Sequence, residues 1–206
     1  METKKLRHYL LHEITIYLIP GISTKVRHQP LGWVHGRIVF MSERASPGPS
    51  TAWRFFAIGV VIAVIITYAA LSGVWVGTDG SWYRSLEQPR WQPPPWVFGF
   101  IWTYNFLALA VVSSAVVWRA VPPRVGVLIF FLAASIASAL AWAYLFYVPH
   151  ELASAAIALS AAAVLTVPIV TIAFLTRPLW GALLLPYQIW VALAASLSWG
   201  YLHLNG

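Results

Sequence analysis

The chain has 206 residues, of which 60% are hydrophobic and only 9% are charged, and its mean hydropathy is +0.73. Soluble domains average about 45–50% apolar and about 25% charged residues, so this composition predicts an integral membrane protein. The absence of cysteine excludes disulfides, thiolate nucleophiles and cysteine-ligated metal centres. The net charge of +7 does not indicate nucleic-acid binding, because the basic residues concentrate in the first 54 positions and at the ends of apolar runs.

Residues 1–50 differ from the rest and are interpreted as a basic N-terminal tail and linker. They contain seven of the thirteen Lys and Arg residues and four of the six histidines. Residues 5–19 have the apolar spacing of a weak interfacial amphipathic helix. Residues 42–50, SERASPGPS, have the composition of a flexible linker. Because Met41 stands immediately before this linker, an alternative hypothesis is that residues 1–40 come from an upstream start assignment.

Beyond the tail, five uncharged apolar runs are each long enough to cross a bilayer. A hydrocarbon core of about 30 Å requires about 20 helical residues. We therefore expect residues 51–206 to form an all-α membrane domain, a bundle of five transmembrane helices. The runs cover residues 55–78, 91–118, 125–149, 152–176 and 178–206.

The charges between the runs predict the orientation in the membrane. Eleven of the thirteen Lys and Arg residues fall on the side that holds the N-terminal tail, the 119–124 connection and Arg177. The opposite side has only Arg84 and Arg90, and counting from Met41 still leaves five against two. The positive-inside rule therefore places the N-terminus in the cytoplasm, and five spans place the first long loop and the C-terminus outside.

Ionisable side chains are almost missing from the runs, where only His203 occurs, near the end of the last one. Pumps and ion-coupled transporters usually need intramembrane charges, so this pattern disfavours them. His8 and His12 have helical i, i+4 spacing, but a solvated face is the preferred interpretation over a metal-ligand pair. The sequence also lacks a phosphate-binding loop, paired carboxylates and a Ser/His/Asp set. We therefore predict no metal site, no resident cofactor and no catalytic residues.

Aromatic residues are densest in residues 82–106, where four tryptophans and four prolines occur in 25 positions. The prolines forbid regular helix until after Pro95, so we expect an ordered aromatic loop that leads into a helix beginning near Trp96. A site lined by indole rings suits a flat hydrophobic molecule. The competing interpretation is that the tryptophans only anchor the protein at the membrane interface. Anchoring is the preferred interpretation for Trp53, Trp75, Trp118 and Trp180, and is weaker for Trp91, Trp96 and Trp102.

One face of the third run is a candidate cavity wall. Four of its residues follow helical i, i+4, i+7 and i+11 spacing, so they share one stripe. Along this stripe small residues give way to large rings, and such a stripe can border a cavity. The four residues are Ser135, Ala139, Trp142 and Phe146.

The aromatic stretch closely resembles the signature of the TspO/MBR family, the tryptophan-rich sensory proteins and translocator proteins, also called peripheral-type benzodiazepine receptors. The matching pattern is Trp82-Tyr83-x-x-Leu86-x-x-Pro89-x-Trp91-x-Pro93-Pro94-x-Trp96-Val97-Phe98-Gly99-x-x-Trp102-Thr103. Two further segments resemble the third and fifth spans of the family, namely Trp142 followed by Leu145-Phe146-Tyr147, and Leu185-Pro186-Tyr187-x-x-Trp190-Val191-x-x-Ala194. The resemblance covers roughly residues 52–206 and leaves residues 1–40 outside.

This resemblance implies a five-helix bundle, often a homodimer in the bilayer, with a pocket beneath the first loop. Family members bind porphyrins such as protoporphyrin IX and haem, and in animals cholesterol and synthetic drugs. We therefore expect the partner to be a hydrophobic small molecule, a tetrapyrrole or a similar flat ligand, bound for transport or regulation. By position, the implied lid and upper wall consist of Trp91, Trp96, Phe98, Gly99 and Trp102. The implied deeper lining consists of Trp142, Phe146, Trp190 and Ala194.

Some positions depart from the family pattern. Ser135 and Ala139 stand where the third span usually has Gln and Asn, and Ser198 replaces an Asn of the fifth span. The loss of the two amides of the third span makes the predicted pocket less polar, and a ligand that needs those hydrogen bonds would lose about 1 kcal/mol for each. The ligand of this chain can therefore differ from that of its relatives.

Two alternative functions stay open. One is a light-dependent porphyrin-degrading enzyme, in which excited porphyrin is oxidised beside Trp142 or Trp190; ligand loss only under illumination would distinguish it from a carrier. The other is a structural or regulatory membrane protein without a small-molecule ligand, whose loop contacts a partner. Saturable quenching of tryptophan fluorescence by protoporphyrin IX would argue against that second alternative.

Overall fold

The computed structural model describes residues 48–76 and 78–206, which lie within one compact unit, Ser46–Gly206. The expectations for a helix over residues 5–19 and for a start at Met41 fall outside these residues. The described residues form six α-helices and no strand.

Five of these helices are long and apolar enough to cross a membrane, with 25 to 28 residues each. At a rise of about 1.5 Å per residue, even the shortest spans about 37 Å, more than the hydrocarbon core. The predicted all-α, five-helix membrane fold is therefore confirmed. The helices are α2 (Thr51–Trp75), α4 (Pro95–Arg119), α5 (Pro122–Tyr147), α6 (Leu152–Thr176) and α7 (Pro178–Asn205).

Proline and short polar caps set the helix starts. The Ser50 hydroxyl accepts a hydrogen bond from the Trp53 amide at 3.2 Å and caps α2. Helices α4, α5 and α7 each begin with proline in the first turn, where no intrahelical N–H partner is lost. Connections of a few residues join α4 to α5, α5 to α6 and α6 to α7, so consecutive helices run antiparallel. Only the α2–α4 connection is long, and it contains the sixth helix, α3 (Gly80–Ser85).

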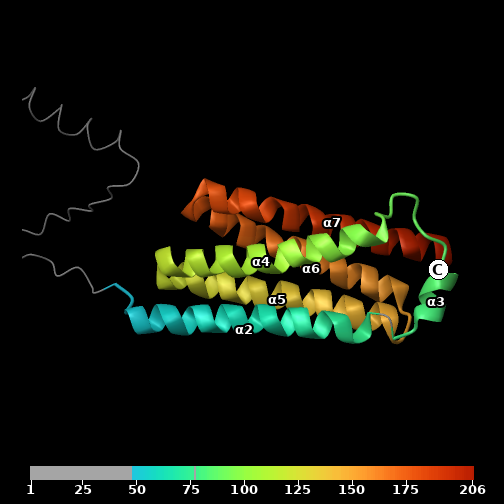
Figure 1. Ribbon diagram of the computed structural model, residues 1–206, viewed down its shortest axis with the longest axis horizontal. Helices are drawn as coiled ribbons and strands as arrows, with labels where there is room; N and C mark the ends of the chain where they lie inside the picture. The colour runs from blue at the N-terminus through green and yellow to red at the C-terminus, as the bar shows by residue number, and fades with distance from the viewer. Residues whose placement is uncertain (1–47, 77) are drawn as a thin grey trace, which may run out of the picture. The chain divides into compact units, whose positions relative to one another are not determined.

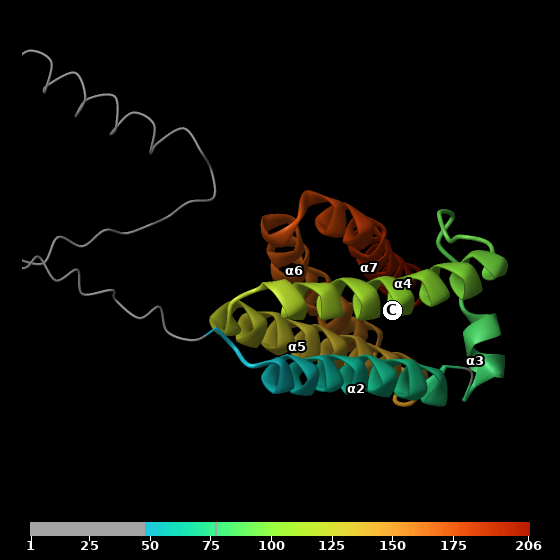
Figure 2. The same cartoon turned by 60° about the vertical axis from the view of Figure 1, so that its left-hand side comes forward.

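The five long helices form a closed bundle (Figures 1 and 2). Helix α2 packs against α4 and α5, α4 packs against α7, and α6 packs against both α5 and α7. The bundle has two distinct ends. The loop end carries α3 and residues 86–94, and the C-terminus lies beside them (Figure 1). The arginine end is defined by the helix-end residues Arg54, Arg119, Arg124 and Arg177.

Aliphatic side chains fill the arginine end. The Arg54 guanidinium donates to the carbonyl oxygens of Trp118 and, at 3.2 Å, of Val117, and it lies 5.8 Å from the centre of the Trp118 ring. These carbonyls belong to the last turn of α4, where intrahelical partners run out, so the guanidinium supplies the missing donors. Fully buried side chains pack behind this contact: Val61, Val112, Val116, Val117, Val125 and Leu128.

A candidate ligand cavity at the loop end

A cavity of about 340 Å³ lies inside the loop end of the bundle. Residues from all five long helices, together with Tyr83 of α3 and Gln92 of the following loop, line its wall. Gly73 and Val76, near the end of α2, belong to its lining and are also exposed. Ligand sites of proteins typically have volumes of about 300–1,000 Å³, and this one falls at the small end of that range.

Seven of the predicted ligand-binding residues come together in the cavity wall. They belong to α4, α5 and α7, which are far apart in the sequence. The fold rather than the local sequence therefore brings them together. The cavity lies where Ala139 and Ala194 leave space between larger rings. The seven are Phe98, Trp102, Ala139, Trp142, Phe146, Trp190 and Ala194.

The other four predicted residues lie outside the lining. Trp96 and Gly99 occupy exposed positions in the first turns of α4, and Trp96 is 73% exposed. Because a helix turns about 100° per residue, Trp96 lies on the side of α4 that faces away from Phe98 and Trp102. Gly99 has no side chain that could reach the cavity. Ser135 is buried, but its hydroxyl donates to the Leu132 carbonyl at 3.1 Å instead of facing the cavity.

Trp91, the fourth of them, packs on α7 rather than over the cavity. A Cβ atom built on Gly200 would lie 2.9 Å from Cζ2 of Trp91 and 2.7 Å from Cγ of Pro89. Real Cβ atoms almost never approach so closely, so the loop can reach α7 here only because residue 200 is glycine. Trp91 therefore fastens the loop to the bundle, while half of its surface, 53%, stays exposed.

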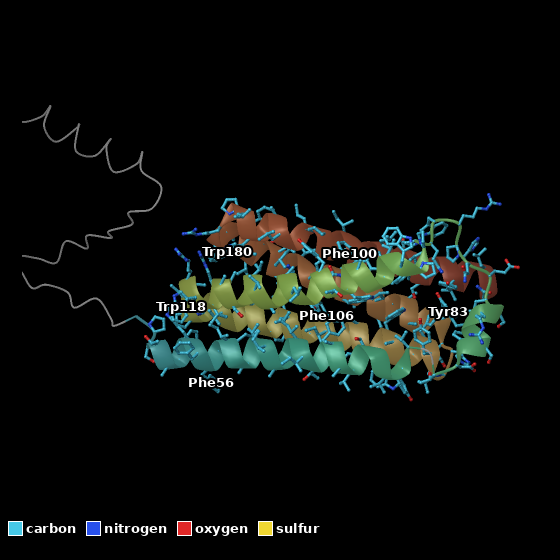
Figure 3. All side chains as sticks on the ribbon, in the orientation of Figure 1. Phe56, Tyr83, Phe100, Phe106, Trp118 and Trp180 are labelled. Atoms are coloured by element: carbon cyan, nitrogen blue, oxygen red, sulfur yellow. The ribbon has the colours of Figure 1, made fainter. Side chains whose placement is uncertain are left out.

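The rings in the wall contact one another edge to face or in offset stacks. Trp102 stacks on Phe106 with ring centres 5.5 Å apart, and Tyr68 meets both edge-on. Phe98 meets Trp190 edge-on at 5.2 Å. These are the geometries that the charge distribution of aromatic rings favours, so the wall is preorganised. Figure 3 labels Phe106 within the bundle, Tyr83 at the loop end, and Trp118 and Trp180 at the arginine end.

Two indole N–H groups in the wall differ in their partners. Nε1 of Trp142 donates to the Ser198 hydroxyl at 3.2 Å. Ser198 thereby orients a cavity ring. Nε1 of Trp190 is buried and has no acceptor among the described residues. An unpaired buried donor is costly, so this N–H is a group that a bound acceptor could satisfy.

Polar groups gather at one end of the cavity, beneath the loop. The hydroxyl oxygens of Tyr83 and Tyr201 are 3.0 Å apart, and the Tyr201 hydroxyl also donates to Oε1 of Gln92. Nε2 of Gln92 lies 3.5 Å from the Tyr83 hydroxyl oxygen. We call these three residues the polar trio. They join α3, the loop and the end of α7 into one hydrogen-bonded group.

Asn205 makes a second attachment between the loop and α7. Its Oδ1 accepts from the Glu87 amide at 2.8 Å, and its Nδ2 donates to the carbonyls of Glu87 and Tyr201, each at 3.0 Å. This side chain therefore replaces a backbone partner for the loop, in the way that a neighbouring strand would. Together with the Gly200 contact and the polar trio, Asn205 fixes the loop of residues 86–94 to the end of α7.

Helix α3 is held by a cap at its N-terminus and by a stacked ring. Oδ1 of Asp79 accepts from the Ser81 hydroxyl at 2.6 Å and from the Trp82 amide at 3.0 Å, and caps the helix. These hydrogen bonds, Ser81 first, lower the pKa of the Asp79 carboxyl, with a smaller contribution from nearby His150. The Trp82 ring stacks on His150 of the α5–α6 connection, with ring centres 3.8 Å apart and 15° between the planes.

Charge is missing from the wall, since none of the described lining residues is Asp, Glu, Lys, Arg or His. Nor do the described residues contain a group of three His, Cys, Asp or Glu side chains that could hold a metal ion. The site can therefore offer apolar surface, aromatic faces and neutral hydrogen bonds. It suits a hydrophobic molecule with few polar atoms.

Sequence reasoning missed several lining residues. Phe106 stands in the fourth helix one turn after Trp102, so helical spacing alone could have found it. Tyr83 and Gln92 lie within the aromatic stretch, but nothing local shows that they meet Tyr201, which is 118 and 109 residues away. The others missed are Tyr68, Ser72, Gly73, Val76, Ala143, Tyr147, Leu159, Val191, Leu197, Ser198 and Tyr201.

Comparison with known proteins identifies the family. The model of the TspO/MBR family matches residues 56–204, which covers all five membrane helices. The chain belongs to the TspO/MBR family. This confirms the resemblance in the aromatic stretch and in the third and fifth spans, and the chain is an integral, multi-pass membrane protein.

Relatives in the TspO/MBR family come from bacteria and animals. The tryptophan-rich sensory protein of Cereibacter sphaeroides is 30% identical over 69% of this chain and 92% of its own length. The human translocator protein is 30% identical over 68% of this chain and 87% of its own. Protein CrtK of Rhodobacter capsulatus is 29% identical over 62% of this chain and 81% of its own.

Proposed function

We propose that this TspO/MBR protein binds a tetrapyrrole, or a flat hydrophobic molecule of similar shape, in the loop-end cavity, and that binding serves transport or regulation. One observation carries the proposal: a cavity of about 340 Å³ that is lined mainly by aromatic rings and small residues and is enclosed by all five membrane helices. A flat conjugated molecule gains both buried area and stacking against such walls.

The arrangement of the wall supports a planar guest. Trp102 and Phe106 form one ring surface, and Phe98 and Trp190 form a second. Ala139 and Ala194 supply no bulk that would fill the space between helices. The printed names of the relatives, sensory protein and translocator protein, agree with a ligand-responsive or ligand-moving role.

The proposal is tested by titrating the purified full chain with protoporphyrin IX in detergent and following tryptophan fluorescence. We expect saturable quenching. Trp190→Phe should weaken binding by about fivefold, because the ring stays while one hydrogen-bond donor worth about 1 kcal/mol is lost. Trp118→Phe, at the arginine end, is the matched control and should leave the affinity unchanged. Quenching that never saturates in a folded sample would refute the proposal.

We further propose that the loop end faces the outside of the cell and the arginine end the cytoplasm. The arginine end carries Arg54, Arg119, Arg124 and Arg177, whereas the loop end carries Arg84 and Arg90. Because the chain has no cysteine, single cysteines report orientation without background. A membrane-impermeant maleimide should label Glu87→Cys in intact cells and label Arg124→Cys only after lysis; the reverse pattern would contradict this orientation.

A further inference from the structure

Positive charge gathers at one corner of the arginine end, where α2 begins, α4 ends and α5 begins. Figures 1 and 2 both show these three helix ends side by side. Arg119 and Arg124 are exposed on either side of the short turn that joins α4 to α5, and Arg54 stands in the first turn of α2. We call these three arginines the cationic corner.

The described residues provide no carboxylate that could neutralise the cationic corner. Their acidic residues, Asp79, Glu87 and Glu151, all lie at the loop end. The one salt-bridge contact among the described residues joins Asp79 to His150, also at the loop end. Residues 1–50, which precede α2, contain seven Lys and Arg but only three Glu, so their net charge has the same sign as the corner. A counter-ion for the corner therefore has to come from outside the chain.

Contacts with α4 hold the Arg54 guanidinium in place. Its Nη1 donates to the carbonyl oxygens of Val117 and Trp118, and the group lies 5.8 Å from the centre of the Trp118 ring. A guanidinium has five N–H bonds, and these contacts use Nη1 alone, so Nε and Nη2 can still donate to an anion. Helix α5 adds the positive end of its dipole, since it starts at Pro122 without a side-chain cap or an acidic residue in the first turn. The corner is thus preorganised for an anionic group.

An exposed apolar stripe of α4 runs from the cationic corner toward the middle of the bundle. Leu107, Val111 and Trp118 follow i, i+4 and i+11 spacing, which keeps them within about 40° of one another around the helix axis. Their exposed fractions are 62%, 64% and 44%. At a rise of about 1.5 Å per residue the stripe is about 16 Å long, close to half of a hydrocarbon core of about 30 Å. It therefore matches the depth of one leaflet.

From the corner and the stripe together we infer that the arginine end binds an anionic phospholipid. The three arginines of the cationic corner hold the headgroup, and an acyl chain follows the stripe of α4. A zwitterionic headgroup fits less well, because it would bring its own ammonium among three guanidinium groups. The inference goes beyond the proposed function and is independent of the ligand in the loop-end cavity, so the two can fail separately.

Two phospholipids with the same acyl chains test this inference on the purified full chain in detergent. Native mass spectrometry measures the apparent Kd of the first retained molecule of dioleoyl-phosphatidylglycerol, which is anionic, or dioleoyl-phosphatidylcholine, which is zwitterionic. A basic residue beside anionic headgroups strengthens binding by about fivefold. We expect the phosphatidylglycerol to bind at least about tenfold more tightly, and a higher concentration of ammonium acetate should reduce this preference.

Double substitutions locate the headgroup. Arg119→Gln/Arg124→Gln removes two charges, so it should weaken binding of the phosphatidylglycerol by about twentyfold and leave binding of the phosphatidylcholine unchanged. Arg119→Lys/Arg124→Lys retains the charges and should keep most of the preference. Arg84→Gln/Arg90→Gln is the matched control, because it makes the same change of net charge at the loop end; it should keep the full preference.

The comparison of the two lipids in the unmodified protein needs no variant to fold, and equal affinities there would overturn the inference. A preference that survives unchanged in Arg119→Gln/Arg124→Gln would place the anionic lipid elsewhere, for instance on residues 1–50, and would overturn it as well. An equal loss in the variants of the two ends would show an effect of net charge alone, with the same consequence. Each of these results leaves the proposed function standing.

Discussion

The two ends of the bundle use the same five helices in opposite ways. At the arginine end, branched aliphatic side chains such as Val116 and Leu128 are fully buried against one another, and Arg54 closes the end of α4. At the loop end, large rings alternate with alanines, and a cavity of about 340 Å³ stays open beneath a fastened loop. Aliphatic chains of similar size can interdigitate, whereas rings opposite alanines cannot fill the gap. The side-chain sizes, and not the helix arrangement, therefore decide which end can hold a ligand.

Filling the cavity should give the largest effect. Ala139→Phe places a ring where Ala139 now lines open space, so porphyrin affinity should fall by at least about tenfold. Ala137→Phe is the matched control, because Ala137 lies on the same helix in an exposed position. Fluorescence titration measures both variants. Equal affinities in the two would show that the ligand binds elsewhere.

Removing bulk from the arginine end should affect stability alone. Leu128 is 1% exposed, so Leu128→Ala should lower the free energy of unfolding by about 2–5 kcal/mol through lost packing contacts. Thermal unfolding in detergent measures the loss, and the porphyrin affinity of the folded fraction should stay within about twofold. A large loss of affinity would mean that the two ends are coupled and that the comparison above is too simple.

Loosening the contact between the loop of residues 86–94 and α7 should give a smaller effect, limited to the loop. A Cβ atom at Gly200 would lie 2.7 Å from Pro89, so Gly200→Ala should push the loop away from α7 at a cost of about 1–3 kcal/mol. Trypsin cleavage after Arg90 should accelerate by about tenfold, because cleavage follows the population of the open loop. Gly59→Ala, where a Cβ atom has nothing within 4 Å, is the control. Unchanged cleavage in both variants would contradict the proposed role of Gly200.

Acidification should give the smallest effect, confined to α3. The pKa of Asp79 is lower in the folded protein than in the unfolded chain, so its contribution to stability is present above the unfolded pKa of about 3.9 and is lost as the pH falls through the lower folded value. Hydrogen exchange of residues 80–85, corrected for intrinsic rates, should therefore accelerate in acid. Asp79→Asn keeps a capping oxygen without the titration and should remove this pH dependence.

Much of the fold could be predicted from the sequence, because sparse charges and prolines mark the span boundaries. The second span begins at Pro95, one residue from the expected start at Trp96, since proline fits the first helical turn. Helix α3 was missed: it has only six residues, and its cap depends on one side chain, Asp79. Periodicity cannot reveal so short an element.

The candidate site could be predicted only in part. The stripe of α5 placed Ala139, Trp142 and Phe146 in the wall, but the same stripe included Ser135, one turn further from the loop end, where the cavity has already closed. Periodicity gives the face of a helix and not the depth of a cavity. The polar trio was missed because Tyr201 meets Tyr83 only through the packing of α7 against the loop, a contact that no local pattern contains.

The most direct test of the account is to locate the ligand. Photolabelling with a diazirine-bearing porphyrin ester, followed by peptide mass spectrometry, should place the label on peptides that contain Phe98–Phe106 and Trp190–Tyr201, and excess unlabelled ester should prevent it. Competable labelling centred on the arginine end, around Arg54 and Trp118, would contradict the claim that the loop-end cavity is the ligand site.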